Sequence, residues 1–140
     1  MKCIVGLGLC LSLMSWNASV AVAGPCNAKT LKGSFGTVSS GTFTAPDGTR
    51  FPEGEVGLFT LDGVNNVSGG DTISFDGNVF TRTITGTYAV NADCSTTFVL
   101  TDNSGGVGTS SGVIVDNGDS VLLISASPGD TLSGKATRIK

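Results

Sequence analysis

Hydrophobic and polar residues alternate along positions 79–100, and this pattern predicts two long β-strands. In the first strand, Phe80, Ile84 and Tyr88 share one face, while threonines fill the other. The second strand has the same period, and the residues at 91–94 predict a turn between the two. We therefore predict a hairpin around which the other strands are arranged.

Turn residues recur at short intervals along the rest of the chain, as in all-β domains. Asp76-Gly77 and Asn117-Gly118 each predict a two-residue hairpin turn, because such turns need positive φ. The one helical signal is a single turn within Asn27–Lys32. The eight strands that we predict are Ser34–Phe43, Glu55–Leu61, Val67–Phe75, Val79–Val90, Ser95–Thr101, Val107–Asp116, Ser120–Ala126 and Thr131–Ile139.

Eight strands with short connections predict an antiparallel up-and-down β-barrel, with a two-sheet sandwich as the alternative. Closing the sheet removes both exposed edges. A barrel in an outer membrane would carry an apolar outer band. The outward positions of the fourth strand are instead polar: Thr81, Thr83, Thr85 and Thr87. We therefore expect no membrane span in the mature domain.

Strand alternation also predicts which side chains face the interior. We expect a packed interior rather than a large cavity. The seventh strand is apolar on both faces from Val121 to Ile124, so we expect the N-terminal segment or a second subunit to cover its outside, the latter making a homo-oligomer. The predicted interior residues are Phe59, Leu61, Val67, Ile73, Phe75, Phe80, Ile84, Tyr88, Val90, Phe98 and Leu100.

The N-terminus has the features of a secretory signal peptide. Lys2 precedes an apolar run of twelve residues, 3–14, and Ala21-Val22-Ala23 fits an A-x-A cleavage pattern. The run is too short to cross a bilayer, which needs roughly 20 apolar residues. We predict that residues 1–23 are cleaved and that 24–140 form one domain, secreted or periplasmic.

Cleavage changes both the charge and the cysteine count. Removing Lys2 from eight basic residues leaves seven against eleven acidic ones, a net charge of −4, which argues against a nucleic-acid partner. Cys26 and Cys94 remain, and an oxidising exterior predicts that they form a disulfide. In the chain-entropy model, closing a loop of this length contributes roughly 4 kcal/mol.

Three charged residues lie on faces predicted to be interior. If Asp76-Gly77 is the turn, Asp71 stands opposite Arg82, and Glu55 lies diagonal to Asp71. A buried arginine needs such partners, because an unpaired buried charge is costly. One interpretation is a structural pair that fixes the register; the other is a polar anchor inside a ligand pocket with apolar walls. The candidate ligand-binding residues are therefore Arg82, Asp71, Glu55 and Tyr88.

Other familiar chemistry is absent from the sequence. There is no histidine, which excludes a Ser-His-Asp triad and any histidine-ligated metal site. No nucleotide-binding fingerprint is present, so we predict no cofactor. The acidic turns do not match an EF-hand loop, and we predict no metal site.

The segment 86–95, GTYAVNADCS, together with 31–36, LKGSFG, and 60–63, TLDG, resembles a group of small secreted bacterial β proteins. Their pattern is roughly L-x-G-x-Y/F-G, then F-D-G, then G-T-Y-x-V-N-x-D-C. The resemblance implies a barrel similar to those of allene oxide cyclases and lipocalins (calycins). It implies a fold and a compartment, and no activity follows from the fold alone.

Three functions remain open. The first is a secreted barrel that binds a small apolar or anionic ligand or has a structural role in the envelope. The second is a cyclase or isomerase that uses the barrel interior; we favour a protein without catalytic activity. The third is an adhesive or matrix protein that associates through its seventh strand. A cavity above roughly 300 Å³ would favour the first two.

Overall fold

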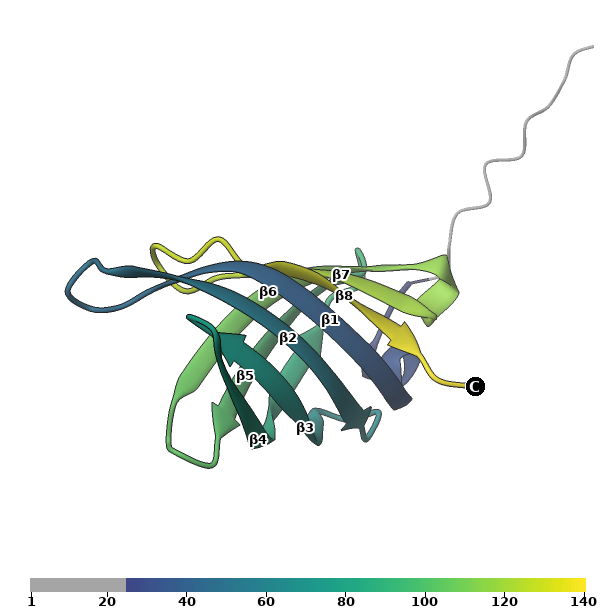
Figure 1. The fold of residues 1–140 in the computed structure, drawn as a ribbon. Helices are drawn as coiled ribbons and strands as arrows, with labels where there is room; N and C mark the ends of the chain where they lie inside the picture. The colour runs from purple at the N-terminus through teal and green to yellow at the C-terminus, as the bar shows by residue number, and fades with distance from the viewer. Residues whose placement is uncertain (1–24) are drawn as a thin grey trace, which may run out of the picture.

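Each strand pairs with its neighbours in the chain, and the last strand pairs with the first, so the sheet closes into an eight-stranded antiparallel barrel (Figure 1). The structure, a computed structural model, describes residues 25–140. The strands are β1 (Gly33–Thr44), β2 (Arg50–Leu61), β3 (Asn66–Phe75), β4 (Asn78–Val90), β5 (Ser95–Asp102), β6 (Val107–Val115), β7 (Ser120–Ser125) and β8 (Ser133–Arg138). The barrel prediction is confirmed, and the sandwich is excluded. The predicted signal peptide, 1–23, lies outside the described residues.

The hairpin turns explain how the register is set. Asp76 and Gly77 have φ of 47° and 80°, and Phe75 pairs with Asn78, so the predicted two-residue turn is confirmed. The two-residue turn at Asn117-Gly118 was wrong: Val115 pairs with Ser120, leaving a four-residue connection. Part of that connection is a short 3₁₀ segment, η2 (Asp116–Gly118).

A 3₁₀ turn, η1 (Ala28–Leu31), precedes β1 and closes one end of the barrel. This confirms the helical turn predicted within Asn27–Lys32. Asn27 begins it with a capping box: its backbone N–H donates to the Thr30 hydroxyl, and its side chain accepts from the Lys29 N–H. Leu31 is then fully buried over the barrel interior. We call this side the closed end.

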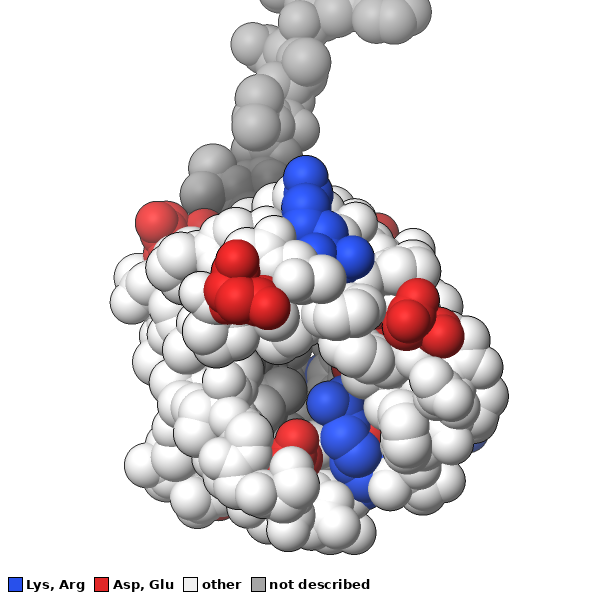
Figure 2. All heavy atoms as spheres, turned by 60° about the vertical axis from the view of Figure 1, so that its left-hand side comes forward, with Lys and Arg blue, Asp and Glu red and all other residues white. Residues whose placement is uncertain are grey.

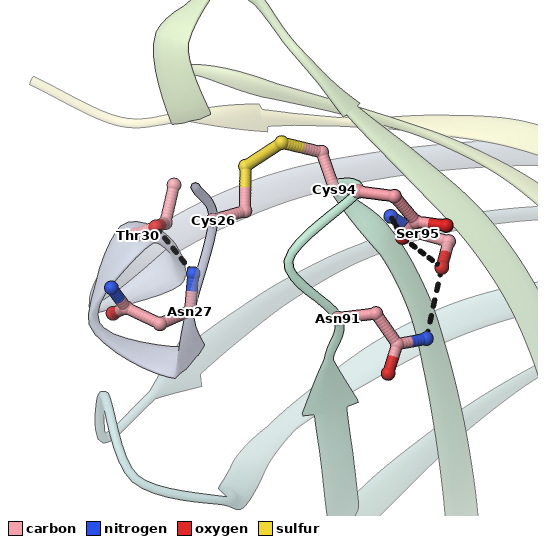
Figure 3. The surroundings of a disulfide bond; sticks show 7 residues. Cys26, Asn27, Thr30, Asn91, Cys94 and Ser95 are labelled. Atoms are coloured by element: carbon pink, nitrogen blue, oxygen red, sulfur yellow. Dashed lines mark hydrogen bonds between the residues drawn. A yellow bond between two sulfur atoms is a disulfide. The ribbon is translucent and has the colours of Figure 1, made fainter. Parts of the chain in front are cut away.

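A disulfide joins Cys26, just before η1, to Cys94, in the turn between β4 and β5 (Figure 3). The predicted pairing is confirmed, and the bond ties the lead-in to the β4–β5 turn at this end of the barrel. Within the same turn, the Asn91 side chain donates to the Ser95 hydroxyl. An oxidised pair points to an oxidising, extracytoplasmic environment.

Arg138 near the C-terminus also fastens the closed end. Its guanidinium donates to the backbone carbonyls of Thr30, Lys32 and Gly118, and it lies 4.7 Å from the centre of the Phe35 ring. The Arg138 side chain thus bonds η1 and the β6–β7 connection to strand β8.

Two predictions about burial differ from the structure: that of Phe80 and that of the outer face of β7. Phe80 lies on the predicted face but is 52% exposed, because β5 pairs only with Ile84–Val90 of β4, and the first part of β4 extends past its neighbour. The outward side chains of β7, Leu122 and Ile124, are exposed, and no segment within 25–140 covers them. A second subunit there stays a prediction. None of the helical segments in this part of the chain is long and apolar enough to cross a membrane.

Candidate ligand-binding cavity

A cavity of about 570 Å³ occupies the barrel interior, so the expected packed core was wrong. Its floor is formed by Leu31 and Phe35 of the closed end, and its rim includes the loops after β5 and β7. Figure 2 looks at the opposite end, which we call the mouth; the surface there is hollowed, and acidic and basic side chains lie in the hollow. The apolar walls come from Phe43, Phe59, Leu61, Val67, Ile73, Phe75, Ile84, Phe98, Leu100, Val121, Leu123 and Leu132.

Small inward side chains leave this volume open. Ser39 of β1, Gly108 and Ser110 of β6, and Ser125 of β7 all line the cavity. Large side chains at these positions would fill an eight-stranded barrel, whose interior is only just wide enough for them. Because these residues are polar or lack a side chain, hydrophobic alternation does not indicate that they face inward.

An ion-pair cluster lies on the cavity wall towards the mouth. Arg82 of β4 donates from Nε and Nη2 to the two carboxylate oxygens of Asp71 on β3, at 2.9 and 2.7 Å. The same Nη2 donates to Glu55 of β2 at 3.1 Å, and Nη1 lies 3.9 Å from Asp102 at the end of β5. The register places Asp71 opposite Arg82, as predicted. Glu55 stands opposite Ile73 and therefore lies diagonal to Asp71, also as predicted.

Asp71 is 5% exposed and therefore depends on its arginine. Room for this pair comes from Gly57, which stands opposite both Thr37 and Asp71. A Cβ at this position would lie 2.6 Å from the Phe59 ring, 2.9 Å from the Thr37 hydroxyl and 3.1 Å from Cβ of Asp71. A larger residue at Gly57 would therefore crowd the Phe59 ring first and Asp71 with it.

Burial changes the acidity of the carboxyl groups inside the cavity. It raises the pKa of Glu55 from 4.5 to about 7; the negative charge of Asp71 adds to the effect, and Arg82 opposes it. Burial likewise raises the pKa of Glu53. Asp102 differs: hydrogen bonds, first from the Ser104 hydroxyl, lower its pKa.

Tyr88, the fourth candidate, lies apart from the other three. Its hydroxyl accepts from the Gly63 N–H at 3.0 Å and donates to the Ala28 carbonyl at 3.1 Å. Its ring stacks on Phe98 with centroids 6.0 Å apart. Tyr88 is not among the residues that line the cavity. The structure therefore places this side chain in the closed end, between η1 and the β2–β3 turn.

Sequence reasoning missed three further carboxylates on the cavity wall: Glu53, Asp102 and Asp130. The predicted second strand begins at Glu55 and leaves Glu53 in a loop, whereas β2 begins at Arg50. Two residues before Glu55, it shares the inner face, so a longer strand would have revealed it. The predicted fifth strand ends at Thr101, one residue short of Asp102, which is the last residue of β5.

Aromatic side chains gather at the same end. The Phe43 and Phe75 rings both line the cavity and meet edge to face, with centroids 5.5 Å apart, and Phe51 packs on Phe75 at 5.0 Å. No group of three histidine, cysteine or acidic side chains within residues 25–140 is arranged to hold a metal ion.

Comparison with known proteins finds likeness of fold only. No family model matches the chain, and no curated protein matches it. One similar solved structure is a de novo designed fluorescence-activating β-barrel, with 16% identity over 80% of this chain and 96% of the design, at a TM-score of 0.55. Another is a redesigned β-barrel, mFAP1, bound to DFHBI, with 23% identity over 79% and 97% of the two chains, at a TM-score of 0.51. At these identities the likeness supports the barrel fold.

Proposed function

We propose that this protein is a secreted small-molecule-binding barrel that holds a largely apolar ligand in its interior cavity. The observation that carries the proposal is the cavity itself: about 570 Å³ of space with apolar walls and a few polar groups converging near its mouth. Ligand sites in proteins have this size and composition. The designed barrel that resembles this fold is bound to DFHBI, a small molecule, which agrees with the proposal.

Secretion is part of the same proposal. The signal-peptide pattern at 1–23 and the Cys26–Cys94 disulfide both support export to an oxidising compartment. The resemblance to small secreted bacterial β proteins agrees with this location.

Titration with Nile red, a neutral apolar dye, tests the binding function. We expect saturable binding to a single site in the wild type. Gly108→Phe and Ser110→Phe place a ring in the cavity and should weaken binding at least about tenfold, because the ring takes the ligand's place. A Cβ at Gly108 meets no other atom within 4 Å, so the first change brings little strain.

The matched control is Gly54→Phe, which also starts from an uncrowded glycine but lies on an outward position of β2. It should bind the dye as the wild type does. Absence of saturable binding would contradict the proposal. Equal binding by the two groups of variants would also contradict it, because the dye would then lie outside the cavity, on exposed apolar side chains of the outer face.

A second candidate is proton-transfer catalysis, favoured by one observation: the pKa of Glu55, about 7, suits a general base at neutral pH. Nitrobenzisoxazole is a suitable probe, since a carboxylate removes its ring C–H proton as the N–O bond breaks to give a cyanophenolate. Turnover that rises through pH 7 and disappears in Glu55→Gln would support catalysis. Turnover unchanged in Glu55→Gln would contradict it.

A further inference from the structure

The charges around the cavity do not balance. Five carboxylates line or adjoin it, whereas Arg82 is the one basic side chain that does so within residues 25–140. Asp71 takes two hydrogen bonds from this guanidinium, and Glu55 takes another. The arginine is therefore already neutralised by its partners, and the surplus is negative. The five carboxylates are those of Glu53, Glu55, Asp71, Asp102 and Asp130.

Glu53 is the carboxylate with no protein partner. Asp102 accepts from Ser104 and Gly106, and Asp130 accepts from Thr44 and Ser125. Within residues 25–140, by contrast, no donor lies within hydrogen-bond distance of the Glu53 carboxylate, although its side chain is half-buried and lines the cavity. A half-buried acceptor without a partner is costly unless a ligand or water supplies one.

Aromatic rings lie next to this carboxylate. Glu53 stands opposite Phe75 in the β2–β3 register, and the Phe75 ring contacts the Phe43 ring edge to face. Ring faces attract cations, and aromatic rings are the groups that proteins use to hold quaternary ammonium ions. Carboxylate and rings together favour the same kind of ligand group.

We propose that the cavity selects ligands that join an apolar body to a cationic head, an amine or quaternary ammonium, with the head at Glu53 and the two phenylalanines. This rests on the proposed ligand-binding function and deepens it. The apolar body lies against the inner walls, towards Leu31 and Phe35, and the head stays near the mouth.

An arginine in a cavity wall usually suggests an anionic ligand, but the carboxylates around Arg82 disfavour one. Two of the three guanidinium nitrogens already donate to Asp71 and Glu55, and Nη1 faces Asp102. An anion placed there would meet the surplus of carboxylates at close range, where the effective dielectric constant is well below that of water.

Three probes with the same naphthylmethyl body separate charge from apolar contact. Naphthylmethyl-trimethylammonium and its neutral isostere, with carbon in place of nitrogen, have the same shape, and naphthylacetate carries a carboxylate on the same body. Calorimetric titration at pH 8 should show the ammonium binding at least about tenfold more tightly than the neutral isostere, and the anion binding most weakly.

Glu53→Gln removes the proposed contact while keeping the side-chain shape. It should reduce the ammonium's advantage over its neutral isostere to about threefold or less and leave binding of the isostere unchanged. Asp76→Asn is the matched control: it removes an exposed carboxylate at the same end, in the β3–β4 turn, and should change neither.

The pH dependence supplies a second readout. Glu55, which faces the cavity, has Glu53 on its own strand, Asp71 on β3, Arg82 on β4 and Asp102 at the end of β5 around it. Because burial raises its pKa to about 7, this carboxyl gains its charge between about pH 6 and 8. Ammonium binding should therefore strengthen over that range, and binding of the neutral isostere should not.

The outcomes are separable. If the neutral isostere binds in the cavity and the ammonium binds no more tightly, the cationic selectivity is wrong and the ligand-binding function stands. If the ammonium's advantage survives in Glu53→Gln, the proposed contact is wrong. If none of the three probes binds, the inference is overturned; if Nile red does not bind either, so is the proposed function.

Discussion

The closed end and the mouth of this barrel use polar groups in opposite ways. At the closed end, the hydroxyl of Tyr88 both accepts and donates a hydrogen bond, and Arg138 donates to three carbonyls. At the mouth, carboxylates outnumber the basic groups that face them, and Glu53 has no protein partner. The Tyr88 hydroxyl and the Arg138 guanidinium are thus bonded within the protein, although the buried Thr96 hydroxyl at this end has no partner. At the mouth, the unpartnered carboxylate lies beside an open volume, where it is available to a ligand.

The largest effect should come from the one strong ion pair near the mouth. Arg82→Met leaves Asp71 buried without its partner and should lower the free energy of unfolding by about 3–5 kcal/mol. Chemical denaturation measures this. The double variant Arg82→Met, Asp71→Leu should recover much of the loss, because it removes the stranded charge as well.

Arg50→Met is the control, since Arg50 is exposed at the start of β2. If it destabilises as much as Arg82→Met, the loss does not come from the ion pair. Failure of the double variant to recover stability would show that the pair also packs in a way that apolar side chains cannot replace.

Removing the disulfide should act at the other end. Replacing both cysteines by serine should cost about 2–4 kcal/mol, chiefly because the unfolded chain loses its cross-link. Hydrogen exchange should accelerate over 26–32, in and around η1, and stay unchanged in the β3–β4 turn, 76–77. Uniform acceleration at both ends would contradict the independence of the two regions.

These two experiments address features that the sequence predicted well. Alternation gave all eight strands, and the turn at Asp76-Gly77 gave the register that brings Asp71 to Arg82. Such features depend on local rules, namely a period of two and a turn that needs positive φ. The pairing of Cys26 with Cys94 could be predicted because they are the two cysteines left after the predicted cleavage of the signal peptide.

The cavity could not be predicted in this way. Its volume depends on Ser39, Gly108 and Ser110 facing inward together, and nothing in their chemistry distinguishes an inner position from an outer one. The predicted burial of Phe80 was wrong for a related reason. Its exposure depends on where the neighbouring strand β5 ends, and alternation along β4 carries no information about that end.

The pH dependence of stability should distinguish the mouth further. Folding raises the pKa of Glu55 from 4.5 to about 7, so the folded state holds this proton more tightly than the unfolded state. The resulting stability is present below about pH 4.5 and is lost as the pH rises towards 7, by about 2–3 kcal/mol. Glu55→Gln, which keeps an acceptor for Arg82, should remove this decline. A wild type and variant with parallel pH profiles would contradict the assignment.

The smallest effect is expected at the closed end. Tyr88→Phe removes the hydroxyl that bridges the Gly63 N–H and the Ala28 carbonyl, which should cost about 1–2 kcal/mol. Binding of Nile red should not change, because the side chain does not line the cavity. Thermal unfolding and dye titration on the same sample would measure both. Loss of Nile red binding with unchanged stability would contradict this and indicate that Tyr88 belongs to the ligand-binding site.

The most direct test of a sealed end and a ligand-binding interior is an NMR titration of the wild type with the neutral naphthyl isostere. We predict saturable shifts at residues that line the cavity, such as Phe59, Ile73 and Ile84, with none at the outward Leu122 of β7 and Val113 of β6. Shifts confined to the outward pair, or no saturable shift at all, would contradict it.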